Sequence, residues 1–321
     1  MKKFYAIFVL VVALSRGASG DVSEINCLEK IPQLICEVAP PLREQDRYVD
    51  GRPCLAVDTQ FYVKQITRAF NSYPKFVQRL GCSLKRIYIE QNFFGPAWSS
   101  PVDENLPTEI LIGLRKKDLD EGADFQIFST WFEQQTFGGS GRFVPPSEFP
   151  LVTIRPRKWA KEPSLIFTLL HELAHALDYL RGYNLPKEHA EYLTSWTHIA
   201  WTDLDKVREE FDFPYRKSIC LNGCSGDFIE PRQAHVVYRE MAMAGFISQL
   251  STTNAREDFA DTFAYYVLDR FMQVNVSVRA NGFDYSINKT LASPKFRVKI
   301  AFIDHVIAGL NKKSILKYRH P

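Results

Sequence analysis

Residues 171–175 read His-Glu-Leu-Ala-His, and this segment constrains the chain more than any other. It lies within an apolar stretch, Leu165–Leu180, whose composition predicts a buried helix. Residues four apart share one face of a helix, so His171 and His175 can offer ring nitrogens to one cation. Glu172 projects from the same turn, where a carboxylate can take a proton from a water molecule. The pattern is typical of a zinc-dependent peptidase and predicts Zn²⁺ as the cofactor.

A catalytic zinc keeps one position open for water, so a third protein ligand is required. Asp178 and Arg181 stand where a glycine and a third histidine would complete a metzincin site, which excludes that arrangement. In the gluzincin arrangement a glutamate arrives from a second helix further along the chain, and Glu257 is the candidate. Asp261 lies four residues further on the same helical face, where it can accept a hydrogen bond from the outer N–H of His171. The alternative interpretation of both acids is an ordinary solvated helix start.

Three segments also carry a family resemblance. They are residues 171–178, the stretch from Thr253 to Phe263, and the stretch Ser293–Phe296. In these segments the chain resembles the catalytic domain of the anthrax lethal factor type, a gluzincin group that includes clostridial Pro-Pro endopeptidases. The resemblance covers roughly the last half of the chain. It implies that His171, His175 and Glu257 are zinc ligands, that Glu172 is the general base, and that Asp261 supports a ligand.

One position departs from that group. Its members commonly carry a tyrosine about seven residues before the ligand glutamate, where the hydroxyl can stabilise an oxyanion. Leu250 occupies that position here and has no group to donate. The donor must then come from elsewhere, or the rate is reduced. The candidate oxyanion stabilisers are Tyr265, Tyr266, Tyr238, Tyr183 and His198.

The patterning predicts an α+β, zincin-like fold: a small mixed sheet, an active-site helix carrying the histidines, and a helical C-terminal lobe. Predicted helices cover Thr59–Leu80, Gln233–Leu250 and about Pro294–Leu310, and predicted strands cover Lys85–Gln91, Glu109–Leu114 and Leu151–Arg155. The last strand precedes the active-site helix, so it could be an edge strand that pairs with an extended substrate. A central, fully paired strand is the alternative. We expect a cysteine-containing segment at 21–58 and a metallopeptidase domain at 59–321.

The start of the chain predicts export. Lys2 and Lys3 precede an apolar run, Phe4–Leu14, and small residues end at Ala18-Ser19-Gly20. This is the pattern of a signal peptide over residues 1–20, and the apolar run is too short to span a bilayer. Its removal takes away three basic and no acidic residues, so the net charge falls from +3 to zero. We therefore expect a secreted or periplasmic protein with no nucleic-acid partner and no stable membrane insertion.

An even number of cysteines in an exported chain favours disulfide bonds over metal binding. The six cysteines are Cys27, Cys36, Cys54, Cys82, Cys220 and Cys224. Proximity in the sequence favours the pairs Cys220–Cys224, Cys27–Cys36 and Cys54–Cys82, among fifteen formal pairings.

Together these features predict an exported zinc endopeptidase that hydrolyses protein or peptide substrates with a metal-activated water and a glutamate base. Two alternatives stay open. One is a catalytically impaired zinc-binding interaction module derived from a peptidase, which Leu250 favours. The other is a hydrolase of cell-wall peptides, which would use the same metal site on a different amide.

Overall fold

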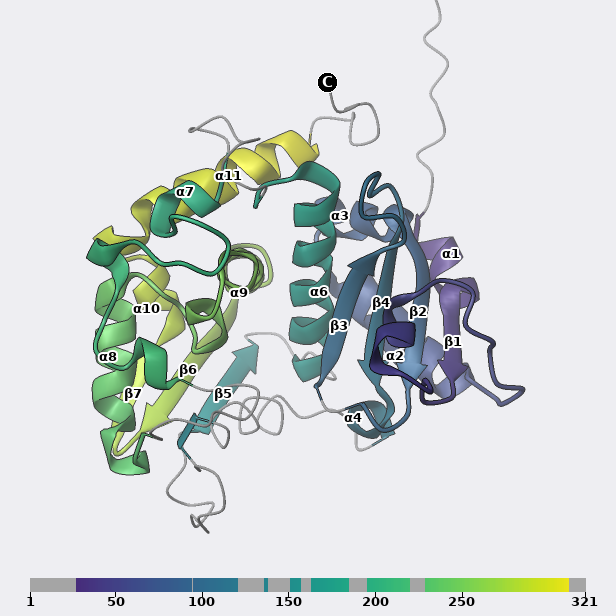
Figure 1. The fold of residues 1–321 in the computed structure, drawn as a ribbon, viewed down its shortest axis with the longest axis horizontal. Coiled ribbons are helices and arrows are strands. Elements are labelled where there is room, and N and C mark those ends of the chain that lie inside the picture. The colour runs from purple at the N-terminus through teal and green to yellow at the C-terminus, as the bar shows by residue number, and fades with distance from the viewer. Residues whose placement is uncertain are drawn as a thin grey trace, which may run out of the picture.

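The computed structural model describes residues 27–93, 95–120, 136–137, 151–156, 163–184, 195–219 and 229–311. The predicted leader and the Cys220–Cys224 pair lie outside these residues. The described chain combines helices with two small sheets, so the α+β prediction is confirmed. Figure 1 shows one sheet on the N-terminal side, a second on the C-terminal side, and the long helix α6 (Pro163–Arg181) standing between them.

The N-terminal sheet is mixed, as predicted, with strand order β1-β2-β4-β3. Its strands are β1 (Ile35–Val38), β2 (Leu84–Glu90), β3 (Ala97–Pro101) and β4 (Ile110–Arg115). β1, β2 and β4 run parallel, and β3 pairs antiparallel with β4 at the edge. The central strand β4 is buried along nearly all its length, as its continuous apolar sequence requires in a sheet covered on both faces. The segment 21–58, which the sequence sets apart, contributes β1.

Helices and 3₁₀ turns pack on both faces of this sheet, and one helix is shorter than predicted. They are α1 (Cys27–Leu34), α2 (Gln60–Ser72), α3 (Lys75–Gln78), α4 (Lys116–Asp120) and the 3₁₀ turns η1 (Glu44–Tyr48) and η2 (Arg79–Ser83). The predicted helix Thr59–Leu80 is wrong as one element, because Tyr73 is extended with ψ of 153°. Pro74 follows it, and a residue before proline is sterically kept out of the helical region.

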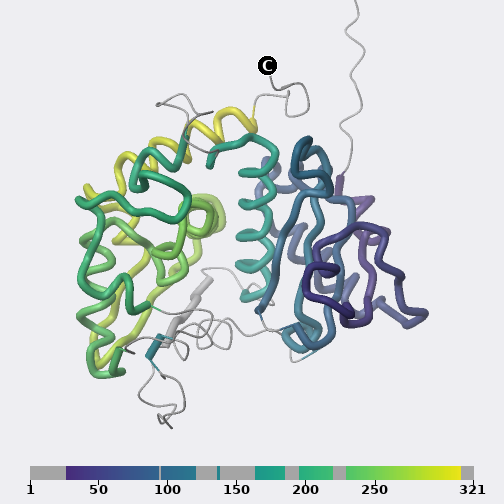
Figure 2. Tube along the Cα trace, viewed as in Figure 1, coloured from purple at the N-terminus to yellow at the C-terminus, as the bar shows by residue number. Residues whose placement is uncertain are grey.

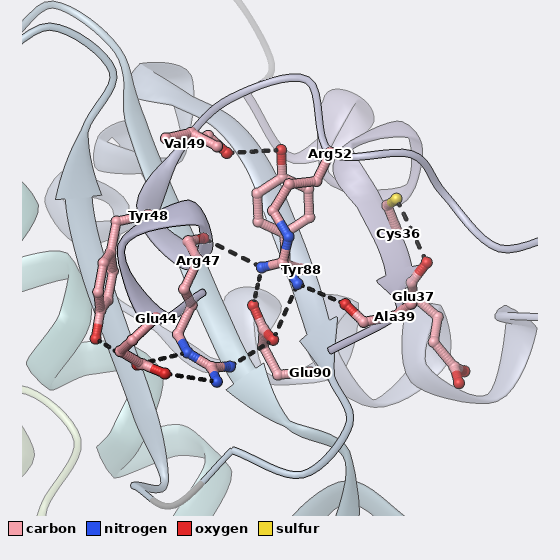
Figure 3. Close-up of polar contacts among 10 residues, drawn as sticks. All are labelled: Cys36, Glu37, Ala39, Glu44, Arg47, Tyr48, Val49, Arg52, Tyr88 and Glu90. Atoms are coloured by element: carbon pink, nitrogen blue, oxygen red, sulfur yellow. Dashed lines mark hydrogen bonds and ion pairs between the residues drawn. The ribbon is translucent and has the colours of Figure 1, made fainter. Parts of the chain in front are cut away.

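Buried charges tie the loop after β1 to the sheet (Figure 3). Glu90, the last residue of β2, is fully buried and forms ion pairs with Arg47 and Arg52. The Tyr48 ring in the same loop lies 5.1 Å from the Trp98 ring on β3. Burying a carboxylate is costly without partners, and the two guanidinium groups offset that cost. The loop is therefore held across the end of the sheet rather than free in solvent.

The disulfide bonds near the N-terminus differ from the predicted pairs. The structure joins Cys27 to Cys82 and Cys36 to Cys54, with Cα separations of 4.9 and 5.4 Å. Cys27 starts α1, which packs on the turn η2 that contains Cys82. The loop after β1 folds back so that Cys54 forms a β-bridge with Val38. Tertiary packing thus outweighs the entropic advantage of short loops, which was the basis of the sequence prediction.

The C-terminal lobe is not purely helical, which corrects a second expectation. It contains an antiparallel sheet of order β5-β6-β7, made of β5 (Leu151–Pro156), β6 (Val274–Ala280) and β7 (Phe283–Ser286). The β6–β7 turn uses Asn281 and Gly282, both with positive φ, as a two-residue hairpin of this twist requires. The buried residues of β6 alternate with exposed ones, so one face of this sheet packs on the lobe.

The strand that borders the active-site helix is β3, not β5. The structure places β5 beside β6 in the second sheet, with a partner on one side only among the described residues. Among these residues it is an edge strand, and it belongs to the sheet of the C-terminal lobe. β3 packs directly against α6 (Figure 1), and its sequence, Ala-Trp-Ser-Ser-Pro, carries no alternation that would reveal it.

The remaining helices build the C-terminal lobe. They are α7 (Thr197–Ala200), η5 (Glu209–Phe211), η6 (Arg216–Ser218), η7 (Pro231–Gln233), α8 (Ala234–Ala244), η8 (Leu250–Thr252), α9 (Ala255–Arg270), α10 (Ile287–Leu291), η9 (Pro294–Phe296) and α11 (Arg297–Asn311). The predicted helix Gln233–Leu250 ends early, because Gly245 adopts a left-handed φ of 85° that terminates α8. No helix in these ranges combines the length and apolar character needed to cross a bilayer. Figure 2 follows the same path along the Cα trace.

Gly113 sits under the indole of Trp98 at the centre of the N-terminal sheet. The two residues are paired across β3 and β4, and a Cβ on Gly113 would collide with the indole ring. We expect Gly113→Ala to lower the free energy of unfolding by about 1–3 kcal/mol, because overpacking forces the ring or the strand to move. Denaturant unfolding would measure the loss. The control is Gly309→Ala in α11, where a Cβ meets nothing within 4 Å. Equal stability of the two variants would contradict the close packing.

Candidate metal centre and active site

The helix α6 carries the histidine pair at its buried centre. Its residues from Ser164 to Asp178 are all buried, so it is a core helix rather than an amphipathic surface helix. His171, Glu172 and His175 are 6%, 5% and 7% exposed. Three polar side chains inside a core are costly unless they have partners or bind an ion. The predicted helix therefore places these three side chains where a bound metal ion would offset the free-energy cost of burying them.

A second helix brings the acidic partner. Asn254 caps α9, and its side-chain oxygen accepts a hydrogen bond from the Glu257 backbone N–H at 3.0 Å. This cap fixes Glu257 in the first turn of α9, and α9 packs along α6. More than 70 residues of sequence separate His175 from Glu257, yet the side chains of the two helices lie close together.

The three candidate ligands form a compact triangle. His171 Nε2 and His175 Nε2 lie 3.0 Å apart, and Glu257 Oε2 lies 3.1 and 3.3 Å from them. Tetrahedral zinc with bonds of about 2.0–2.2 Å places its ligand atoms about 3.3–3.6 Å apart. The observed separations are within about 0.3 Å of that range. Two imidazoles and one carboxylate therefore fit a single zinc ion with a fourth position left for water.

The charges around the triangle favour a cation. Burial lowers the pKa of His171, but its hydrogen bond to Asp261 and the charges of Asp261 and Glu257 outweigh burial and raise that pKa well above its usual value. Burial raises the pKa of Glu257, but the charges of His175 and His171 outweigh it and hold that pKa well below its usual range. A pocket that attracts a proton to an imidazole so strongly also attracts a metal ion.

Asp261 orients the first histidine, and a serine that the sequence did not reveal supports it. Asp261 Oδ1 lies 2.7 Å from His171 Nδ1, which leaves Nε2 directed at the triangle. The Ser248 hydroxyl donates to the other carboxylate oxygen of Asp261. Such partners set the tautomer and orientation of a ligating histidine. Ser248 lies in the loop before η8, and no spacing rule links it to the motif.

Glu172 is buried beside the ligands. Burial raises the pKa of its carboxyl group, while the charges of His171 and His175 lower it. Ser99 on β3 also acts to lower this pKa, so the edge strand and the carboxyl group are close neighbours. A carboxylate with a raised pKa next to a metal site is suited to accept and return a proton near neutral pH.

A buried ion pair fixes the helix that carries Glu257. Lys299 Nζ on α11 donates to Asp258 Oδ1 at 2.6 Å and to the Gly245 carbonyl oxygen at 2.7 Å. The indole N–H groups of Trp196 and Trp201 donate to the other Asp258 oxygen at 3.2 and 3.0 Å. Lys299 is 1% exposed and Asp258 is fully buried. Lys299 and both indoles donate to the Asp258 carboxylate. These contacts fix α9 relative to α11 and to the residues that flank α7, next to Glu257. Sequence analysis did not identify this cluster.

The two candidate oxyanion donors on α9 have contacts of different kinds. The Tyr265 ring packs 4.7 Å from the Phe167 ring of α6. The Tyr266 hydroxyl donates to Asp304 of α11, and burial raises the pKa of Tyr266 to about 12. Tyr266 therefore contacts α11, whereas Tyr265 packs against α6, the helix that carries the histidine pair.

The other three candidates sit within the C-terminal lobe. The Tyr238 hydroxyl accepts a hydrogen bond from Gln249 at 3.0 Å. The Tyr183 ring packs 5.5 Å from Phe259, and His198 belongs to the short helix α7. Leu250 starts η8 and is half-buried.

A comparison with known protein families agrees with this site. The model of the family described as "putative zinc-binding metallo-peptidase" matches residues 157–308, a stretch that contains α6, α9 and all three candidate ligands. No curated protein and no solved structure matches the chain. The family match supports a zinc metallopeptidase that acts on a peptide or protein substrate, and the cluster of His171, His175 and Glu257 could hold its metal ion.

Proposed function

We propose that this protein is an exported zinc endopeptidase of the gluzincin type, similar to the lethal factor group. The convergence of His171, His175 and Glu257 from two distant helices carries the proposal. Zinc bound there would polarise the scissile carbonyl and acidify a water molecule. The two imidazoles and the carboxylate hold the ion, and Asp261 keeps His171 in the ligating tautomer.

Glu172 moves the proton in this proposal. Its carboxylate accepts a proton from the attacking water and returns it to the leaving amine nitrogen, so one residue serves both halves of the reaction. The buried position beside the ligands and the raised pKa support this role. A donor for the oxyanion is still needed, because Leu250 supplies none; of the tyrosines, Tyr265 is favoured by its contact with α6.

Export accounts for the start of the chain and the cysteines. We infer that residues 1–20 are a signal peptide and that the metallopeptidase domain begins near residue 59, preceded by a cysteine-containing segment. The two disulfide bonds, Cys27–Cys82 and Cys36–Cys54, are compatible with an oxidising compartment. Removal of residues 1–20 leaves no net charge, which supports a protein or peptide substrate rather than nucleic acid.

Metal removal tests the proposal. The oxidised protein, purified after export, is incubated with a proteome-derived peptide library, and products are identified by mass spectrometry. We expect cleavage that 1,10-phenanthroline abolishes and that added zinc restores, because the ion is required for both polarisation and water activation. One bound zinc per chain without any cleavage would instead favour a binding module. Cleavage of peptidoglycan cross-links alone would favour a cell-wall hydrolase.

A further inference from the structure

The interface between α6 and α9 is a row of paired side chains that runs out to solvent. His171 faces Asp261, His175 faces Glu257, and Tyr179, one turn further along α6, faces Arg256. The α9 side chains become more exposed along this row: 3% for Asp261, 24% for Glu257 and 42% for Arg256. Exposure therefore rises along the row toward Arg256, and a substrate that reaches the metal centre from this side passes the guanidinium group.

Arg256 is oriented mainly by the Tyr179 ring and not by hydrogen bonds from its guanidinium group to described residues. Its guanidinium carbon lies 5.1 Å from the centre of the Tyr179 ring, a stacked arrangement. Its Nε lies 3.9 Å from Asp178 Oδ2, too far for a hydrogen bond, and no described residue accepts a hydrogen bond from this buried atom. The nearer Asp178 oxygen already accepts the Asn184 N–H at 2.8 Å. Among the described residues no hydrogen bond holds the guanidinium group, and the side chain is 42% exposed, so its outer nitrogens can bind a ligand.

Two arginines in the loop after β1, Arg47 and Arg52, differ in this respect. Arg47 donates to Glu44 and Glu90, and Arg52 donates to Glu90 and to two backbone carbonyl oxygens, so both arginines are structural (Figure 3). A planar guanidinium group with free donors binds carboxylates in a forked geometry. The surroundings of Arg256 therefore select a ligand with a carboxylate.

The position of Arg256 sets where that carboxylate would lie. The Tyr179 layer is one helical turn, about 5–6 Å, beyond the His175 layer along α6. An extended peptide advances about 3.3 Å per residue, so a group bound at Arg256 lies roughly two residues from a bond held at the metal.

We propose that Arg256, stacked on Tyr179, is a subsite that binds a substrate carboxylate roughly two residues from the scissile bond. This inference rests on the proposed peptidase function and adds its substrate class: peptides with an acidic side chain at that position, or with a free C-terminus there. The chemistry is the same for both sources, a forked pair of charge-assisted hydrogen bonds.

Two peptide libraries test the subsite. They share their sequences, with Asp, Glu, Asn and Gln at internal positions, but one ends in free carboxylates and the other in amides. Products from the wild type, Arg256→Gln and Arg256→Lys are compared. The matched control is Arg270→Gln, since Arg270 also lies beside an aspartate and a tyrosine ring on α9, but at the opposite end of the helix.

We expect the wild type to prefer a carboxylate at one position by about 10-fold to 100-fold, mainly through KM, because a charge-assisted hydrogen bond is lost without it. Arg256→Gln should remove the preference, Arg256→Lys should keep a weaker one, and Arg270→Gln should leave it unchanged. A preference for the free-acid library identifies the C-terminus as the source; a preference for internal Asp or Glu identifies a side chain. Cleavage without charge preference, or an unchanged preference in Arg256→Gln, would overturn the subsite.

Binding separates this inference from the proposed function. The same libraries are passed over immobilised zinc-loaded wild type and Arg256→Gln, and retained peptides are identified. If nothing is cleaved, but carboxylate peptides are retained in an Arg256-dependent way, the peptidase proposal fails and the subsite stands. Zinc content and thermal unfolding are measured for each variant. If Arg256→Gln loses zinc or unfolds, the test uses Arg256→Lys instead. A folded, zinc-loaded Arg256→Lys protein that shows no preference for a carboxylate contradicts the proposal.

Discussion

Glu172→Gln should reduce peptide cleavage by about 10²-fold to 10⁴-fold, the usual contribution of a general acid–base group. Glutamine keeps the size of the side chain but cannot accept the proton of the attacking water. Because Glu172 is not one of the three converging ligands, zinc content should stay at the wild-type value. Cleavage rate on a library-derived peptide and zinc analysis of the same sample measure the two effects separately.

The control for this variant is Glu240→Gln on α8, whose carboxylate pairs with the neighbouring Arg239. It makes the same chemical change far from the α6–α9 interface and should leave the rate unaltered. Wild-type turnover by Glu172→Gln would mean that another group takes the proton. Loss of zinc in this variant would mean that the residue acts as a ligand or holds the site together.

Glu257→Ala should lower zinc affinity by more than Asp261→Asn does. Loss of an outer partner such as Asp261 typically costs about 10-fold to 100-fold in metal affinity, whereas Glu257 supplies one of three protein ligands. Zinc retained against a competing chelator gives the order of the variants. The expected order of affinity is wild type, then Asp261→Asn, then Glu257→Ala.

The reverse order, or equal zinc in all three proteins, would show that a different residue completes the coordination. Glu240→Ala again serves as the control for a carboxylate outside the site. Its zinc affinity should equal that of the wild type, and its unfolding midpoint shows how much of any change reflects general stability.

The hairpin of β6 and β7 has a clear sequence signal, although the sequence analysis does not include it. β6 reads Val-Asn-Val-Ser-Val-Arg-Ala, with strict alternation, and Asn281-Gly282 follows directly as a hairpin turn. This pattern is among the strongest local signals for a two-residue hairpin. The expectation of a helical lobe rests on the predicted helices Gln233–Leu250 and Pro294–Leu310, which lie on either side of this hairpin in the sequence. β3, in contrast, has no local signal, since its partner β4 and helix α6 decide its conformation.

The buried clusters depend on long-range packing. Lys299 reads as one lysine among apolar residues of a C-terminal helix, and nothing local predicts that it is fully buried against Asp258. Arg256 likewise reads as part of a charged helix start. The orientation of its guanidinium group depends on Tyr179 and Asp178, which lie on another helix more than 70 residues earlier in the chain. The cysteines near the N-terminus show the same limit: proximity in sequence favours Cys27–Cys36 and Cys54–Cys82, and the structure forms neither pair.

What the sequence by itself determined is local: a helix over the histidine motif, one face shared by His171 and His175, and a capped helix that starts before Glu257. These follow from the 3.6-residue repeat and from capping, which act within a few residues. The sequence named Glu257, but only the tertiary structure decided that this carboxylate lies 3.1 Å from an imidazole, that β3 borders α6 and that Arg256 lies at the exposed end of the row. Those contacts join distant segments, and they arise from the burial of whole helix and sheet faces rather than from any local preference.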